Sequence, residues 1–208
     1  MTDDVVGACR ALVTRGLSLA ISTELPDAAQ QSVRELGEAG LRLSAVSVYV
    51  AEGSETWQLV TLNPPPVRWD RRLLSPLAAR VAGRDGAVER GDEIHSEGET
   101  SVVSIAIAVG DAAVVELACE PGSTADGATL RDCATGFAVL VHRAADLREM
   151  EAARGQLAQL DDELIALHDG SLSLSSADER EVAGNVVKLA TTELGFDRAG
   201  VFYIDRGA

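Results

Sequence analysis

The sequence is poor in aromatic residues and in lysine, and each shortage narrows what the chain can do. Aromatic side chains make up 3% of its 208 residues, so a buried core has to rest on Val, Leu, Ile and Ala. Lys188 is the sole lysine, and the net charge at pH 7 is -15. Proteins that bind DNA or RNA need a basic surface to displace counterions from phosphates. The sequence has no basic stripe, so we expect no nucleic-acid partner.

Cysteine is also scarce, and its spacing argues against a metal site. Cys9, Cys119 and Cys133 are far apart and form neither a Cys-x-x-Cys motif nor a His/Cys spacing suited to zinc. We interpret them as small buried residues in a reducing compartment. The acidic run 161–163 occupies consecutive positions of a helical pattern, whose side chains point in different directions, and we interpret it as a solvated face. We expect no metal.

Catalytic and targeting motifs are missing as well. The chain contains no phosphate-binding glycine loop and no GxSxG or HExxH motif, so we predict that it is not an enzyme. The start Met1–Asp4 has no basic region typical of a signal peptide. No apolar run reaches the roughly 18 residues that cross a bilayer. We therefore expect no membrane span and a cytoplasmic location.

A repeat organises the chain. A shift of 154 residues places 45–53 over 199–207, where Ala, Tyr and Gly coincide, and 16–23 over 170–177. Two acidic helix-and-strand units could also match through composition alone. A true repeat predicts that the second copy stops after its first strand. Since one helix and one strand do not make a domain, the chain would then be a fragment of a longer protein, either a natural truncation or an expressed piece.

Apolar periodicity predicts most of the elements. We expect, in chain order, helices over 4–21 and 26–40, strands over 44–51 and 56–62, a helix over 71–82, a polar loop over 84–99 with one short strand at 87–90, strands over 101–109 and 112–119, and a helix from 129 onward. The strand over 101–109 has small residues on its second face, so both of its faces should be covered. Gly110 and Asp111 form the hairpin turn to the next strand.

The last helix should be about forty residues long and carries a heptad pattern. One stripe has Met150, Leu157 and Leu164 seven residues apart, and the second has Ala153, Leu160 and Leu167. The pattern favours a short coiled coil, and a single helix packed on its own domain is the alternative. We therefore divide the chain into a domain over 1–145, a helical linker over 146–170 and an incomplete second unit over 171–208.

The hairpin carries a family resemblance. Residues 100–119, an apolar strand followed by a Gly turn and a strand with Val115-Glu-Leu117, resemble the same part of GAF domains, which are small-molecule-sensing modules of bacterial signalling proteins. Helix 129–145 resembles their C-terminal helix, 74–83 the helix before their third strand, and 193–205 the entry to their first strand. The resemblance implies an α+β fold, with an antiparallel sheet of about six strands and flanking helices. A long linker helix and the first helix and strand of a second GAF-like unit would follow.

Ligand expectations come from this resemblance. It implies a pocket over the sheet walled by 63–98, and tentative pocket residues are Trp69, Leu77, Val103 and Ile105. The cyclic-nucleotide motif of the family and the Cys-His pair of bilin-binding members are missing. Haem would need an axial ligand, and we interpret His95 as a surface residue and His142 as a helix-surface or interface residue. The cofactor is therefore unknown, and whether a small-molecule ligand exists is open.

The function implied is regulatory. Two chains would pair and pass ligand or partner state through a dimeric helical linker to a downstream output domain that lies outside this chain. Tentative dimer-interface residues are Leu12, Met150, Leu157, Leu160, Leu164 and Leu167. The alternative is a dimerisation and interaction module that has the GAF fold and binds no ligand. The sequence does not distinguish a kinase, a cyclic-dinucleotide enzyme or a transcription regulator as the output.

Overall fold

The structure is a computed structural model that describes residues 2–52, 56–95, 101–123, 125–174 and 179–202. The chain divides into two compact units, Met1–Arg148 and Glu149–Ala208. The first unit contains the sheet and both candidate cavities. The boundary falls inside one long helix, α4, which runs from Gly127 to Leu174.

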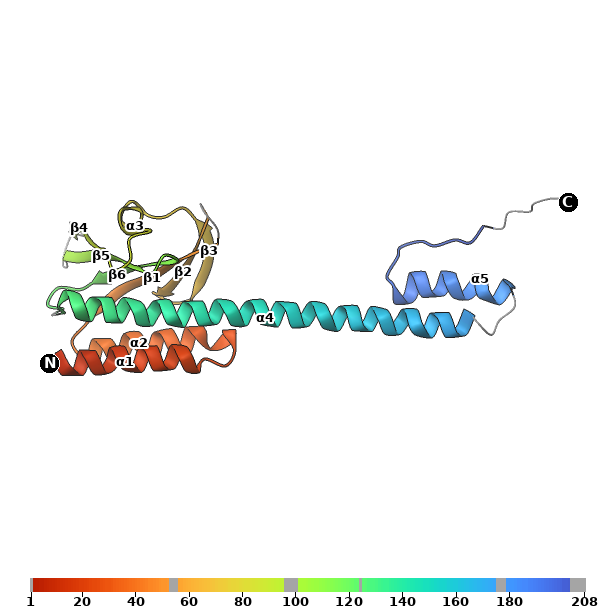
Figure 1. The fold of residues 1–208 in the computed structure, drawn as a ribbon, viewed down its shortest axis with the longest axis horizontal. Helices are drawn as coiled ribbons and strands as arrows, with labels where there is room; N and C mark the ends of the chain where they lie inside the picture. Colours follow the sequence, from red (N-terminus) through yellow and green to blue (C-terminus); the bar gives the residue numbers. More distant parts are fainter. Residues whose placement is uncertain (1, 53–55, 96–100, 124, 175–178, 203–208) are drawn as a thin grey trace. The chain divides into compact units, whose positions relative to one another are not determined.

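A six-stranded antiparallel sheet is the frame of the first unit (Figure 1). Its strands are β1 Leu43–Ala51, β2 Trp57–Asn63, β3 Arg68–Arg72, β4 Val88–His95, β5 Ser101–Val109 and β6 Ala113–Cys119. The order across the sheet is β3-β2-β1-β6-β5-β4, which places β1 and β6 in the centre and leaves β3 and β4 at the edges. The expected α+β class with a six-stranded antiparallel sheet and a long helix is confirmed.

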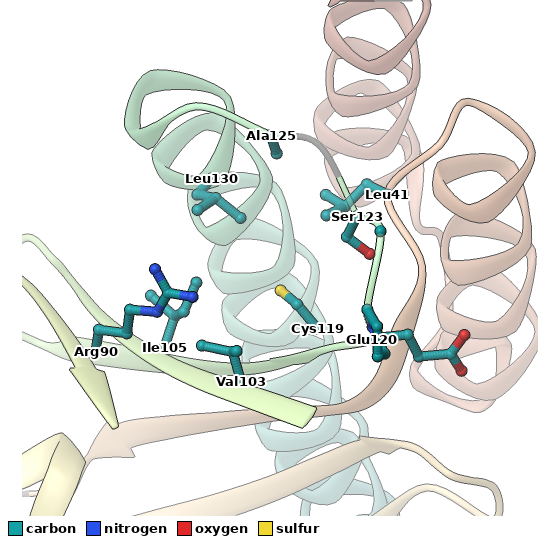
Figure 2. A pocket seen from close by; sticks show the side chains of 11 residues that line it. Leu41, Arg90, Val103, Ile105, Cys119, Glu120, Ser123, Ala125 and Leu130 are labelled. Atoms are coloured by element: carbon teal, nitrogen blue, oxygen red, sulfur yellow. The ribbon is translucent and has the colours of Figure 1, made fainter. Parts of the chain in front are cut away.

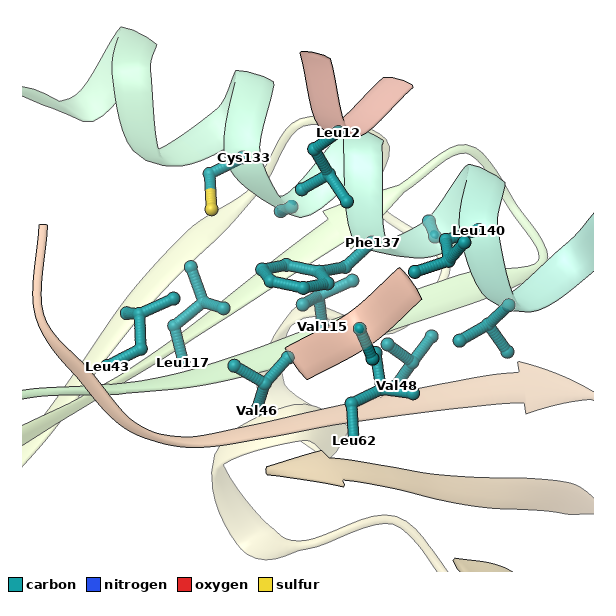
Figure 3. Packing of buried hydrophobic residues seen from close by; sticks show 14 of the residues in the cluster. Leu12, Leu43, Val46, Val48, Leu62, Val115, Leu117, Cys133, Phe137 and Leu140 are labelled. Atoms are coloured by element: carbon teal, nitrogen blue, oxygen red, sulfur yellow. The ribbon is translucent and has the colours of Figure 1, made fainter. Parts of the chain in front are cut away.

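Three helices cover one face of this sheet. Helices α1 (Thr2–Ser18), α2 (Leu25–Glu38) and the first part of α4 lie on the same side (Figure 1). The Phe137 ring of α4 has no exposed surface and lies between Leu12 of α1 and the central strands (Figure 3). A short 3₁₀ helix, η1 (Ser22–Glu24), joins α1 to α2. Among the described residues, the buried side chains of this core are aliphatic or cysteine apart from the Phe137 ring, in keeping with the shortage of aromatic residues.

Two glycines allow α1 and α4 to approach closely. A Cβ atom added to Gly136 would lie 2.7 Å from Leu12 Cγ, and one added to Gly16 would lie 3.0 Å from the backbone nitrogen of Leu140. The distance at Gly136 is shorter than two carbon atoms tolerate without movement, and the distance at Gly16 is tighter than most contacts of a Cβ atom, so glycine suits both positions. A further contact holds α2 to α1, because Arg15 donates to Ser32 Oγ and to both carboxylate oxygens of Glu35.

The other face of the sheet is covered in part by α3 (Pro76–Val81). This helix packs Ala78 and Val81 onto a small buried cluster that includes Tyr49 and Ala106. The sequence predicted a longer helix over 71–82, and that prediction was wrong at its start, because residues 71 and 72 belong to β3. Ser75 accepts a hydrogen bond from the Ala78 N–H and begins the helix with a proline at the next position.

Two other predictions change in extent. Strand β4 covers Val88–His95, so the short strand predicted at 87–90 is longer and the polar loop correspondingly shorter. The strand β3 was not predicted at all. It contains three arginines, an aspartate and Trp69, a composition that gives no alternating apolar pattern, and it forms because it lies at the edge of the sheet beside β2.

The second unit contains the remainder of α4, the helix α5 (Glu179–Lys188) and a short π-helix, η2 (Leu189–Glu193). Residues 195–202 form neither helix nor strand. The predicted first strand of a second copy is therefore absent over 199–202, and its remainder lies outside the described residues. A strand needs a partner for its backbone hydrogen bonds. Within the described ranges, no helix is long and apolar enough to cross a membrane.

Candidate functional site

The face of the sheet that carries α3 contains a cavity of about 420 Å³, which we call the α3-side cavity. Its floor consists of small side chains from three neighbouring strands. Its wall is the start of α3, and Glu116 of β6 supplies a carboxylate. The lining residues are Ala45, Ser47, Ser75, Pro76, Leu77, Arg80, Arg90, Gly91, Ser104, Glu116, Leu117 and Ala118.

A hydrogen-bond network fixes the Glu116 carboxylate in this cavity. Its oxygen Oε2 accepts from Tyr49 Oη at 3.2 Å, and Oε1 accepts from Ser75 Oγ. Ser75 Oγ in turn accepts from the Ala78 N–H at 3.0 Å. Burial and the nearby Glu116 charge raise the pKa of Tyr49, so the phenol stays protonated and keeps donating. The network ties α3 to the centre of the sheet and holds a polar group at the cavity wall.

A second cavity of about 370 Å³ lies on the opposite face, between the sheet and the start of α4 (Figure 2). We call it the helix-side cavity. Apolar side chains of β5, the first turn of α4 and the α2–β1 connection surround it, and the loop after β6 forms its roof. The lining residues are Leu41, Arg90, Val103, Ile105, Cys119, Glu120, Pro121, Gly122, Ser123, Ala125 and Leu130.

The roof loop is tied to the chain at Arg42. The Arg42 N–H donates to Ser123 Oγ, which donates to the Arg42 carbonyl oxygen at 3.1 Å. The Glu120 N–H donates to the same carbonyl at 3.0 Å. These bonds hold the loop beside Leu41 and keep the cavity open beneath it. At the other end of the loop, Asp126 accepts from the Thr129 N–H and begins α4.

Cys119 and Arg90 set the electrostatics of the helix-side cavity. Burial raises the pKa of the Cys119 thiol to about 11, and the positive charge of Arg90 offsets only part of that rise. The thiol is therefore neutral near pH 7. Arg90 lies on β4 opposite Ile105, and its guanidinium is turned toward the cavity (Figure 2). In contrast, the Glu120 carboxylate points away from it (Figure 2).

The four tentative pocket residues do not line one cavity. Leu77 lines the α3-side cavity, whereas Val103 and Ile105 line the helix-side cavity. Trp69 lines neither cavity. It packs against the main core, and the Arg148 guanidinium lies over its ring at 4.4 Å from the centroid. Because side chains alternate between the two faces of a strand, Ser104 and Ile105 face opposite cavities.

The tentative interface residues also separate into two groups. Leu12 is fully buried inside the first unit, so the structure places it in the core and not on a surface. The remaining five are exposed on the second part of α4, with between 43% and 66% of their surface accessible: Met150, Leu157, Leu160, Leu164 and Leu167.

Neither a scan against protein-family models nor a search of the curated proteins matches this chain. His142 is half-buried on α4, while His95 ends β4 and its side chain lies outside the described residues. In the part of the chain that the structure describes, no three His, Cys, Asp or Glu residues gather as a metal site. The three cysteines are free and buried.

Sequence reasoning missed the polar residues of both cavities. Glu116 interrupts the apolar strand β6 on the face whose neighbours are small, and that interruption was a signal for a group pointing into a cavity. Ser75 precedes a proline, which was a signal for a helix start. Arg90 gave no signal, because it ends the short strand predicted at 87–90 within a polar stretch, and its pairing with Ile105 depends on the folded sheet.

Proposed function

We propose that this chain is a regulatory module of the GAF type from a signal-transduction protein. In this proposal it passes the state of a ligand or partner through a dimeric helix to an output domain. One observation carries the proposal. The helix α4 contributes fully buried residues such as Phe137 and Leu140 to the core of the first unit, and further along it exposes a heptad row of leucines.

The heptad row is the surface that calls for a partner. Leu157 and Leu164 are seven residues apart and are 66% and 64% exposed. Complete burial of a leucine side chain is worth roughly 1.5–3 kcal/mol, so leaving this row in water is unfavourable. A second copy of the same helix fits the row, because a 3.5-residue apolar repeat matches the knobs-into-holes packing of a coiled coil.

The two cavities supply candidate positions for a small molecule. Both fall within the roughly 300–1,000 Å³ that ligand pockets occupy. The α3-side cavity lies on the face that the GAF resemblance implies, and its Glu116 carboxylate suits a ligand that donates hydrogen bonds. Ligand binding would signal only through a different affinity for two arrangements of the helices.

The alternative function is a dimerisation and interaction module that binds no ligand. The exposed heptad row favours it as strongly as it favours a sensor, because the row requires only a partner helix. The two functions differ in one measurement. A specific ligand raises the melting temperature as its concentration rises, whereas a ligand-free module keeps one melting temperature throughout a metabolite screen.

The repeat of 154 residues supports a second GAF-like unit in this proposal. Shifted by that distance, α2 (Leu25–Glu38) falls on 179–192, which α5 and η2 occupy. The same shift places α1 on 156–172, inside α4. The second part of α4 would then serve both as the linker and as the first helix of the next unit.

Adjacent substitutions test the dimer. We expect Leu164→Lys to convert the chain from dimer to monomer in sedimentation velocity, because a lysine in the row places a charge inside the helix pair. Ile165→Lys is the matched control, since Ile165 is 54% exposed and lies beside the row. It should leave the dimer intact. Equal sedimentation of the native chain and both variants would contradict the proposal.

A further inference from the structure

The helix-side cavity has the features of a binding site for an anion with an apolar body. Aliphatic side chains line it, among them Val103, Ile105 and Leu130, together with the neutral Cys119 thiol. The Arg90 guanidinium borders the same cavity beside Ile105, its partner across the strands (Figure 2). The site therefore combines aliphatic side chains with polar groups of the roof loop and one guanidinium, and a few polar groups among apolar side chains are usual in a small-molecule pocket.

Among the described residues, none pairs with the Arg90 guanidinium. It makes no hydrogen bond or ion pair with any residue in the described ranges, although the exposed arginine Arg80 pairs with Glu89 and the half-buried Arg15 with Glu35. A guanidinium presents five N–H donors in a planar fork that matches the two oxygens of a carboxylate. The Glu120 carboxylate, which also lines this cavity, points away and leaves the fork unopposed (Figure 2).

We propose that the helix-side cavity binds a small monocarboxylic acid, with its apolar body against Ile105 and Leu130 and its carboxylate on the Arg90 guanidinium. A phosphate ester fits less well, because Arg90 is the only cationic side chain among the described lining residues. The volume of about 370 Å³ lies near the lower end of the range for ligand pockets. A chain of about eight carbons or a single aromatic ring with a short acid arm therefore suits it.

The helix-side cavity lies at the start of α4, so a bound acid could act on the helix that carries the proposed signal. Leu130 is in the first turn of α4, and Ala125 is in the loop that leads into it. An occupant would contact α4 at its start and hold the roof loop. This role in signalling rests on the proposed function, whereas binding of the acid does not. Sedimentation of Leu164→Lys tests the dimeric role without any acid present, so either proposal can fail alone.

Octanoate and 3-phenylpropanoate are the probes for a direct test on the full chain. We expect each to raise the melting temperature with concentration and to give a saturable heat of binding. Arg90→Met should weaken octanoate binding at least about tenfold, since a hydrogen bond to a charged group contributes roughly 1.5–3 kcal/mol. 1-Octanol, which has the same apolar body without the charge, should bind at least about tenfold more weakly than octanoate.

Arg90 borders both cavities, so its substitution alone does not show which cavity binds the acid. Substitutions at the neighbouring residues Val103 and Ser104 distinguish the two. Val103→Phe fills the helix-side cavity. It should weaken octanoate binding at least about tenfold, as much as Arg90→Met does. Ser104→Phe fills the α3-side cavity from the opposite face and should leave the affinity unchanged. Circular dichroism shows whether each variant is folded. If Val103→Phe does not fold, Arg90→Met still tests the proposal.

Cys119 reports the site directly. At ten times the dissociation constant, octanoate should slow the reaction of Cys119 with N-ethylmaleimide about tenfold, as measured by peptide mass spectrometry. Cys9 lies outside the cavity and should be slowed less than Cys119. The proposal is overturned if neither acid binds, if binding is insensitive to Arg90→Met, or if Ser104→Phe and not Val103→Phe abolishes it.

Discussion

The two parts of α4 differ in the width of their apolar stripe, and the width indicates the kind of partner. Over Gly127–Arg148, buried positions recur in adjacent pairs such as Cys133 and Ala134 or Phe137 and Ala138. Over residues 149–169, the heptad residues Leu157, Leu160 and Leu164 form a narrow row, and Ile165 lies beside it. A wide stripe is typical of a helix that lies on a core, and a narrow one of a coiled-coil seam.

Helical periodicity alone does not decide which residues of α4 are buried. Leu140 and Leu157 belong to the same helix, yet the first has no exposed surface and the second is 66% exposed. The difference arises because the sheet, α1 and α2 fold around the first part of α4. The second part presents its leucines for a partner that the proposed function identifies as another chain.

The largest test of this contrast removes one side chain from each part. Phe137→Ala should destabilise the first unit by about 3–5 kcal/mol, because it empties the centre of the core. Leu157→Ala should change the unfolding free energy of the isolated monomer by less than about 0.5 kcal/mol, as expected of a surface position. Urea denaturation at low protein concentration measures both. Comparable losses would refute the contrast.

Two glycines of α4 test the same difference between its two parts, with smaller expected changes in unfolding free energy. Gly136→Ala places a Cβ atom 2.7 Å from Leu12 Cγ and should cost about 1–3 kcal/mol through overpacking. Gly155 has no atom within 4 Å of the added Cβ, so Gly155→Ala should raise helix stability by up to about 1 kcal/mol. The urea midpoint should therefore move in opposite directions. A shift of the same sign in both variants contradicts the packing described.

Acid titration gives the smallest effect, and it should be confined to the first unit. The hydrogen bonds from Arg15 lower the pKa of Glu35 from its ordinary value of 4.5. A lowered folded-state pKa stabilises the protein above the unfolded value, and this contribution disappears as the pH falls below 4.5 through the folded pKa.

This contribution is tested by measuring the unfolding free energy from pH 7 to pH 3. Arg15→Met should flatten the loss of stability below pH 4.5 by at most about 1 kcal/mol, because both partners are partly exposed. Arg10→Met is the control, since Arg10 is exposed on the same helix and makes no side-chain ion pair with a described residue. An identical acid limb in native chain and Arg15→Met would remove the role assigned to the pair.

Much of the fold follows from local pattern, and the parts that do not have a common cause. The hairpin at Gly110 and the helix containing Phe137 show strong periodicity and form as predicted. Strand β3 and the full length of β4 lack such a pattern, because edge strands are polar and form through pairing with β2 and β5. Long-range pairing is not encoded in a short window of sequence.

The candidate site was less predictable than the fold for a related reason. Alternation places Val103 and Ile105 on one face, but it does not say which face carries a cavity. The separation of Leu77 from these two residues depends on where α3 crosses the sheet. Arg90 joins the site only through its register opposite Ile105. Residue type suggested an apolar pocket, and only the folded sheet supplied its charge.

The contact between Arg148 and Trp69 gives the chain an optical label of its own. The guanidinium lies 4.4 Å from the centre of the indole ring, and Arg148 is the last residue of the first unit. The chain has two tryptophans, so Trp57→Phe would leave Trp69 as a single emitter. A cation over an aromatic face is held by electrostatic attraction that depends on distance. The fluorescence intensity and emission wavelength of Trp69 would then change with any displacement of α4 at Arg148.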